Sequence, residues 1–145
     1  MIRYHIEQIP FKLAKKQVIT NWIKSVISFE SNHQMVPGDI NIILCSDEYL
    51  LEINKKFLSH DYFTDIITFD YCEGKRISGD LFISIDTVEA NSSTYGTLFH
   101  NELNRVIIHG VLHLLGYNDK SKDEIILMKE AEDRALENLS ILING

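Results

Sequence analysis

Cysteines, prolines and long apolar runs are scarce in this chain of 145 residues. Its two cysteines, Cys45 and Cys72, stand far apart without a Cys-x-x-Cys pair, so neither a disulfide framework nor a cysteine-ligated zinc site is indicated. No run approaches the roughly 18 apolar residues of a membrane span, and the N-terminus lacks the apolar segment of a signal peptide. We therefore expect a single globular domain, residues 1–145, in the cytoplasm and without membrane contact.

Positive charge is also limited, because 14 Lys and Arg face 21 Asp and Glu, for a net charge of −7. This balance argues against a protein that holds nucleic acid by bulk electrostatics, so any contact with RNA must be local. The chain also lacks a glycine-rich phosphate loop and a nucleophile elbow. The basic residues expected nearer to the site described next are Lys55, Lys56, Lys75, Arg76 and Arg105.

The distinctive feature that is present is the segment from His109 to Asp119. His109 and His113 lie four residues apart in an apolar run that predicts a helix from about Leu98, so their side chains project from nearly the same face. Gly116 is suited to end that helix in a left-handed conformation, after which Asp119 could supply a third ligand. Two imidazoles and one carboxylate with an open fourth position are typical of a catalytic zinc site.

The histidine pair does not by itself require a zinc site. Two core histidines bonded to carbonyl groups would need no metal, although burying two adjacent imidazoles is costly. The same donors also suit Fe²⁺ or Mn²⁺, which keeps an iron-dependent oxygenase in view. Gly110 stands where the metalloprotease signature needs glutamate, so peptide hydrolysis is not expected. His100 is about half a turn out of phase with His109, and we exclude it as a ligand.

Hydrophobic periodicity predicts strands that alternate with helices, which is typical of an α/β or α+β fold. The strands are expected at residues 2–9, 40–45, 66–71 and 77–85, and the helices at residues 12–29, 47–57, 86–95, from about 98, and 121–139. Trp22 is expected in the core. Ser46, Asp86 and Ser121 are suited to be helix N-caps, and Ser121 would form a capping box with Glu124.

The motif His-Gly-x-Leu-His-Leu-x-Gly-Tyr resembles that of the YbeY family of bacterial metal-dependent endoribonucleases, and the likeness covers most of the chain. Further matches to this family are Asn54, Phe57, Asp61, Thr64, Asp65, Phe69, Gly79, Asp80 and Glu102. Two positions depart from the family pattern. Leu58 stands in place of an arginine that the family uses in phosphate contact and catalysis, and Asp119 stands in place of the third histidine.

The resemblance implies an α+β (mixed α/β) domain with a mixed, mostly parallel four-stranded sheet, against which the His-x₃-His helix packs. It implies one Zn²⁺ per chain, or another divalent ion, held by His109, His113 and Asp119. The expected activity is single-strand-specific endoribonuclease cleavage of rRNA precursors at a metal-activated water. The family's roles in maturing the 3′ end of 16S rRNA and in ribosome quality control imply RNA and the ribosome or its small subunit, not DNA, as partners.

The catalytic residues expected besides the metal ligands are Glu102, by its match to the family, and Arg105, which shares the histidine face. Arg105, Lys56 or His60 could replace the missing arginine. Asp65 and Asp80 could orient the histidines, or could be ordinary turn and cap residues. The alternative function is that of a ribosome-assembly binding factor with a structural or weakly active metal site, which the acidic composition and the missing arginine would suit.

Overall fold

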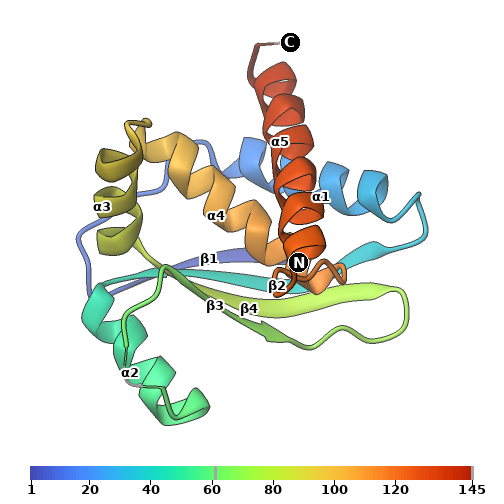
Figure 1. The fold of residues 1–145 in the computed structure, drawn as a ribbon. Coiled ribbons are helices and arrows are strands. Elements are labelled where there is room, and N and C mark those ends of the chain that lie inside the picture. Colours follow the sequence, from blue (N-terminus) through green and yellow to red (C-terminus); the bar gives the residue numbers. More distant parts are fainter. Residues whose placement is uncertain (61, 145) are drawn as a thin grey trace.

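The computed structural model describes residues 1–60 and 62–144, in which four strands form one sheet with helices on both faces (Figure 1). The strands, in their order across the sheet, are β1 (Ile2–Glu7), β2 (Val36–Cys45), β4 (Arg76–Ser84) and β3 (Ile66–Asp70). β2 pairs in parallel with both β1 and β4, whereas β3 is antiparallel to β4. The predicted mixed, mostly parallel four-stranded sheet is therefore confirmed. Asp61, one of the matched motif residues, lies outside the described residues.

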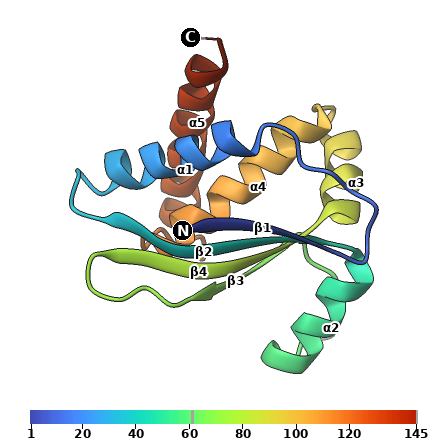
Figure 2. The same cartoon turned by 180° about the vertical axis from the view of Figure 1, so that it is seen from behind.

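Most helices cover one face of this sheet. The helices are α1 (Lys16–Glu30), α2 (Asp47–Leu58), α3 (Ile85–Tyr95), α4 (Phe99–Leu114) and α5 (Lys122–Asn144). Figures 1 and 2 show α1, α4 and α5 on the same side of the sheet, α3 near one end of the strands, and α2 on the opposite side. No helix in the described ranges has both the length and the apolar content needed to cross a membrane.

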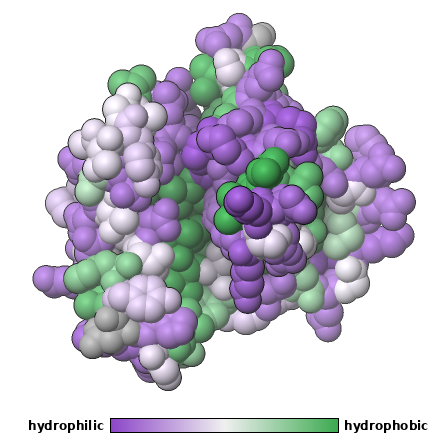
Figure 3. Space-filling view, viewed as in Figure 1, coloured by the Kyte–Doolittle hydropathy of each residue, from purple (hydrophilic) through white to green (hydrophobic). Residues whose placement is uncertain are grey.

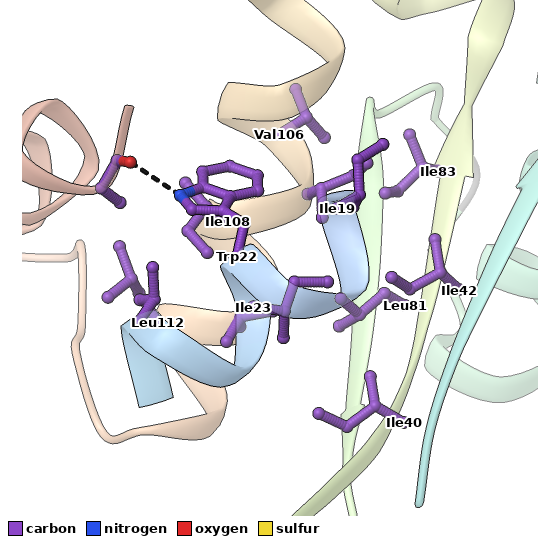
Figure 4. Close-up of a cluster of buried hydrophobic side chains, with 14 of the residues drawn as sticks. Ile19, Trp22, Ile23, Ile40, Ile42, Leu81, Ile83, Val106, Ile108 and Leu112 are labelled. Carbon is purple, nitrogen blue, oxygen red and sulfur yellow. Dashed lines mark hydrogen bonds between the residues drawn. The ribbon is translucent and has the colours of Figure 1, made fainter. Parts of the chain in front are cut away.

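The main core lies between the sheet and helices α1, α4 and α5. Trp22 is fully buried there, as expected, and its indole Nε1–H donates to the backbone oxygen of Ala135 at 2.7 Å. Figure 4 shows this ring beside apolar side chains of α4, with Leu81 and Ile83 of β4 nearby. Burial of these apolar groups fixes α4 on the sheet, and with it the direction in which its polar residues project.

Gly110 allows α4 to approach the sheet closely. A Cβ atom at this position would lie 2.8 Å from Cδ1 of Ile66 and 2.9 Å from Cδ2 of Leu81, closer than van der Waals contact permits. The glycine that excludes the protease signature therefore also has a packing role, because no larger residue fits there unless the side chains of Ile66 and Leu81 shift.

Several predicted boundaries need correction. β2 begins at Val36, not at residue 40, because residues 36–39 extend the pairing with β4 through a register shift. α1 begins at Lys16, not at residue 12, because Lys15 has a left-handed backbone with φ of 58°. The N-cap of α3 is Ser84, not Asp86, since Ser84 accepts from the backbone N–H of Thr87.

The predicted caps of α2 and α5 are confirmed. The hydroxyl of Ser46 accepts from the backbone N–H of Tyr49, and Ser121 forms the predicted capping box with Glu124.

Some apolar residues of the helices are exposed. Ile125 and Ile126 of α5 are 50% and 54% exposed, and Phe57 of α2 is 57% exposed. α5 has more apolar residues than the stripe that faces the core can accommodate. Met128 and Ala131 lie in that stripe. Periodicity identified the helix correctly, but it did not identify which of its apolar residues find a partner.

Candidate metal centre

His109 and His113 project from the last two turns of α4 and meet Asp119 from the following loop. Their Nε2 atoms are 3.0 Å apart, and Oδ2 of Asp119 lies 3.3 Å from each of them. Donor atoms about 2.0–2.2 Å from a tetrahedral zinc ion would be separated by roughly 3.3–3.5 Å. Among the described residues, these three form the group whose donor atoms lie close enough to hold one ion. The tertiary structure thus brings the three predicted ligands together.

The outer nitrogens of both imidazoles are already hydrogen-bonded. Nδ1 of His113 lies 2.9 Å from the backbone oxygen of Tyr117, which can only accept, so this nitrogen carries the proton. Nδ1 of His109 lies 2.7 Å from Oε2 of Glu132, another acceptor. Both Nε2 atoms then present lone pairs toward Asp119. Three electron-rich atoms that converge in this way repel one another unless a cation lies between them, and so the donor set fits a divalent metal ion.

The turn that leads to Asp119 is fixed where the chain leaves α4. Gly116 has φ of 102°, and its N–H bonds the oxygen of His113, while the N–H of Tyr117 bonds the oxygen of Leu112. This is a Schellman motif and confirms the predicted role of Gly116. The hydroxyl of Tyr117 donates to Oε1 of Glu30 in α1 at 2.6 Å. The loop therefore reaches Asp119 along a defined path, with little entropy left to lose when an ion binds.

Glu132 of α5 belongs to this site, although no sequence motif indicated it. Its side chain is 10% exposed, with Oε2 on His109 and Oε1 2.7 Å from Nη1 of Arg105. Burial raises the pKa of Glu132, but the hydrogen bonds and charges of His109 and Arg105 outweigh burial and hold it below its usual value. The available signal was an acidic residue on the core-facing stripe of α5, between Met128 and Ala135, where an unpaired carboxylate would be costly.

Arg105 faces α5 as well as the site. Its Nη1 pairs with Glu132 and its Nη2 lies 2.7 Å from Oδ1 of Asp133. Two carboxylates therefore balance its charge, and the guanidinium links α4 to α5 beside the metal ligands. A direct part of Arg105 in catalysis stays a prediction.

Two further carboxyl groups lie next to the ligands. Glu102 lines the same cavity as His109 and Asp119, and burial raises its pKa while Arg105 opposes the rise. Asp65 lines a second cavity with both histidines, and burial raises its pKa while the charge of His109 lowers it. Asp80, the other proposed orienting residue, instead accepts from Nδ2 of Asn41 in the neighbouring strand, so it does not orient either histidine.

The candidate replacements for the family arginine near Leu58 make contacts within their own segment. Nζ of Lys56 lies 5.3 Å from the ring centroid of Phe57, and Nδ1 of His60 is 2.9 Å from the hydroxyl of Tyr62. Neither Lys56 nor His60 is among the residues that line the two cavities at the metal ligands. Their part in catalysis stays a prediction.

Two cavities open from the ligands in different directions. One, of about 400 Å³, lies against β3 and has Thr64, Thr68 and Asp70 in its wall. The other, of about 690 Å³, lies between α3 and α5 and has Tyr95 and Ile125 in its wall. His109 and Asp119 line both cavities, so the two cavities lie on either side of these side chains. Figure 3 shows a hollow on this face, with apolar surface between the α3 side and the α5 side.

Comparison with known proteins gives consistent matches along the whole chain. A family model described as "Endoribonuclease YbeY" matches residues 2–140. Proteins named endoribonuclease YbeY include one from Parabacteroides distasonis, 52% identical over 135 residues and 93% of each chain. The one from Phocaeicola vulgatus is 50% identical over 141 residues, covering 97% of this chain and all of the relative, and the one from Porphyromonas gingivalis W83 is 43% identical, covering 93% and 87%.

A solved structure supports the fold. The solution structure of a Thermotoga maritima protein aligns with a TM-score of 0.59 at 26% sequence identity. The alignment covers 94% of this chain and 88% of the other.

Proposed function

Because this chain belongs to the YbeY endoribonuclease family, we propose that it is a metal-dependent endoribonuclease that cleaves single-stranded RNA. The observation that carries the metal dependence is the convergence of three ligand atoms from His109, His113 and Asp119, with both outer imidazole nitrogens already bonded. We propose one Zn²⁺ per chain, since two imidazoles and one carboxylate suit zinc, although Fe²⁺ and Mn²⁺ also accept this set.

When bound, such an ion supplies Lewis-acid stabilisation of charge on phosphoryl oxygens and acidifies water. The protein's own groups orient the ligands and transfer protons. Hydrogen bonds from His109 to Glu132 and from His113 to Tyr117 fix the ring orientations, so neither ring has to reorganise on binding. Glu102 has a buried carboxyl group in the same cavity, where burial raises its pKa above the usual value, and we propose that its carboxylate oxygen accepts or returns a proton during cleavage.

The substrate that we propose is an rRNA precursor, with cleavage near the 3′ end of 16S rRNA and a part in ribosome quality control, in the cytoplasm. Family membership is the support for this assignment. With a net charge of −7, the protein must bind RNA through local contacts and through the ion itself. The ribosome or its small subunit would then deliver the substrate, which compensates for weak electrostatic attraction.

The test is cleavage of an end-labelled single-stranded RNA by the zinc-loaded protein, beside the chelated protein and the His113→Ala variant at equal concentration. Cleavage by the loaded protein that is lost in both controls is the expected result. Cleavage equal in all three would show a contaminating nuclease and contradict the proposal. If metal is bound but no cleavage exceeds the His113→Ala background, the protein is better explained as a ribosome-assembly binding factor, which its acidic charge and Leu58 would suit.

A further inference from the structure

The cavity between α3 and α5 differs from the cavity beside β3 in the chemistry of its walls. The β3 cavity is bordered by hydroxyl and carboxyl groups, among them Thr64, Thr68 and Asp70. The α3–α5 cavity has a polar floor at the metal ligands but an aromatic and aliphatic rim, formed by Tyr95 and Ile125. A chain that crosses the ligands from one cavity to the other therefore meets two different environments.

Tyr95 is presented to this cavity on a rigid support. It is the last residue of α3, and 64% of its surface is exposed. The helix ends on Gly96, with φ of 69°, whose N–H bonds the oxygen of Ser93, and the N–H of Thr97 bonds the oxygen of Ser92. These two backbone hydrogen bonds fix the backbone at Tyr95. Because the backbone is fixed, only the side-chain rotation of Tyr95 has to be restricted when its ring stacks on a ligand.

Lys129 lines the opposite, α5 side of the same cavity, one helical turn after Ile125. It makes no ion pair within the described part of the chain. An ammonium group in the wall of the cavity and an exposed ring at its rim match two parts of a nucleotide, a phosphate and a base. The cavity volume of about 690 Å³ also lies within the range of about 300–1,000 Å³ that is usual for small-ligand sites.

We propose that the α3–α5 cavity is a nucleotide subsite in which Tyr95 stacks on the unpaired base at one side of the cleaved phosphodiester, and Lys129 contacts an adjacent phosphate. This inference rests on the proposed function, because the metal ligands supply the point at which the RNA is cut. A base inside a duplex already has neighbours on both faces and cannot stack on Tyr95 without leaving its pair. The subsite thus requires an unpaired nucleotide on this side only, whereas the polar β3 cavity makes no such demand.

The experiment combines variants of the protein with abasic substitutions in the RNA. Steady-state cleavage of a short single-stranded RNA is measured for wild type, Tyr95→Ala, Tyr95→Phe and Tyr71→Ala, each zinc-loaded. Tyr71 is the matched control because it is similarly exposed but does not line either cavity. Loss of base stacking predicts a KM raised roughly tenfold in Tyr95→Ala with little change in kcat, and near wild-type values in Tyr95→Phe and Tyr71→Ala.

Abasic sites placed in turn on each side of the cleaved bond locate the subsite. An abasic site on one side of the bond is expected to raise the KM of the wild type by about the same factor as Tyr95→Ala does. In Tyr95→Ala the same abasic site should not raise KM further, because the stacking partner of that base is already absent. Equal KM values for wild type and Tyr95→Ala, or equal abasic effects on both sides, would overturn the stacking assignment while RNA cleavage still stood. Absence of cleavage by the wild type would overturn the proposed function, and this subsite with it.

Discussion

Nδ1 of His109 and Oε2 of Glu132 lie 2.7 Å apart, so a proposed metal ligand on α4 is oriented by a carboxylate on α5. The same carboxylate is held by Arg105 through its other oxygen. The orientation of the imidazole therefore depends on how two helices pack, and not only on the motif that contains the ligands. Partners of this kind fix the tautomer of a metal-binding histidine and raise its basicity.

Removal of this partner should weaken metal binding. Glu132→Ala is expected to lower the affinity for zinc about 10–100-fold, and Glu132→Gln by less, because the amide can still accept from His109 but lacks the charge. The measurement is competition with a chromophoric chelator. Glu130→Ala is the control, since Glu130 is exposed on the same helix. Affinities in Glu132→Ala that equal those of the control would show that Glu132 does not support the ligand.

Asp119 should be needed for tight binding of the ion. Asp119→Ala leaves two imidazoles and removes the one anionic donor, so equilibrium dialysis is expected to show loss of the tightly bound ion. Lys120→Ala, a change at the next exposed position of the loop, should keep it. Retention of one tightly bound ion per chain by Asp119→Ala would remove Asp119 from the ligand set.

Acid should oppose metal binding at a pH set by His109. Burial lowers the pKa of His109, but its hydrogen bond to Glu132 and the charges of Glu132 and Asp119 outweigh burial and raise the pKa above 6.5. A proton competes with the ion for this ring, so below the raised pKa the zinc affinity should fall about tenfold for each pH unit, and above it the affinity should level off. Chelator competition across this pH range measures the profile.

The Glu132→Ala variant provides the control for this profile. Without the carboxylate of Glu132, its hydrogen bond and charge no longer oppose burial, so the pKa of His109 should fall and the onset of acid competition should move to lower pH. A zinc affinity that does not change with pH on either side of 6.5 would contradict the assigned role of His109.

The Arg105→Ala variant tests whether the guanidinium group beside the proposed ligands affects the rate of RNA cleavage. Arg105→Ala is expected to slow RNA cleavage while one ion per chain still binds at saturating zinc, because the variant loses a charge near the site and one of two partners of Glu132. Asp133→Asn, which removes only the outer ion pair of Arg105, should have a much smaller effect. Rates in Arg105→Ala equal to wild type would exclude any part of this residue in the reaction.

Gly110 should be intolerant of even one methyl group. Gly110→Ala places a Cβ atom 2.8 Å from Ile66 and 2.9 Å from Leu81, and the strain is expected to cost about 1–3 kcal/mol in the free energy of unfolding. Asn101→Ala, at an exposed position of the same helix, is the control. Urea denaturation measures both. A stability of Gly110→Ala equal to that of Asn101→Ala would mean that the side chains of Ile66 and Leu81 make room without cost.

The features that were predictable from the sequence are local in the chain. The spacing of His109 and His113 places them on one helix face, whatever surrounds that helix, and Gly116 ends it by its own backbone freedom. The capping box at Ser121 is equally local. For this reason the histidine pair and the turn after it could be predicted before any tertiary contact was known, whereas the mixed sheet was expected only from the resemblance to the family.

The tertiary structure alone decided which distant residues meet these ligands. Glu132 reaches His109 only because α5 packs across α4, and Tyr95 borders the same cavity as Ile125 only because the chain brings α3 and α5 around the site. The exposure of Ile125 was unpredictable for the same reason. Periodicity predicts the helix, but it does not tell which of the apolar residues on that helix the core will cover. Contacts between segments far apart in sequence depend on the packing of the whole chain, and no local pattern of residues encodes them.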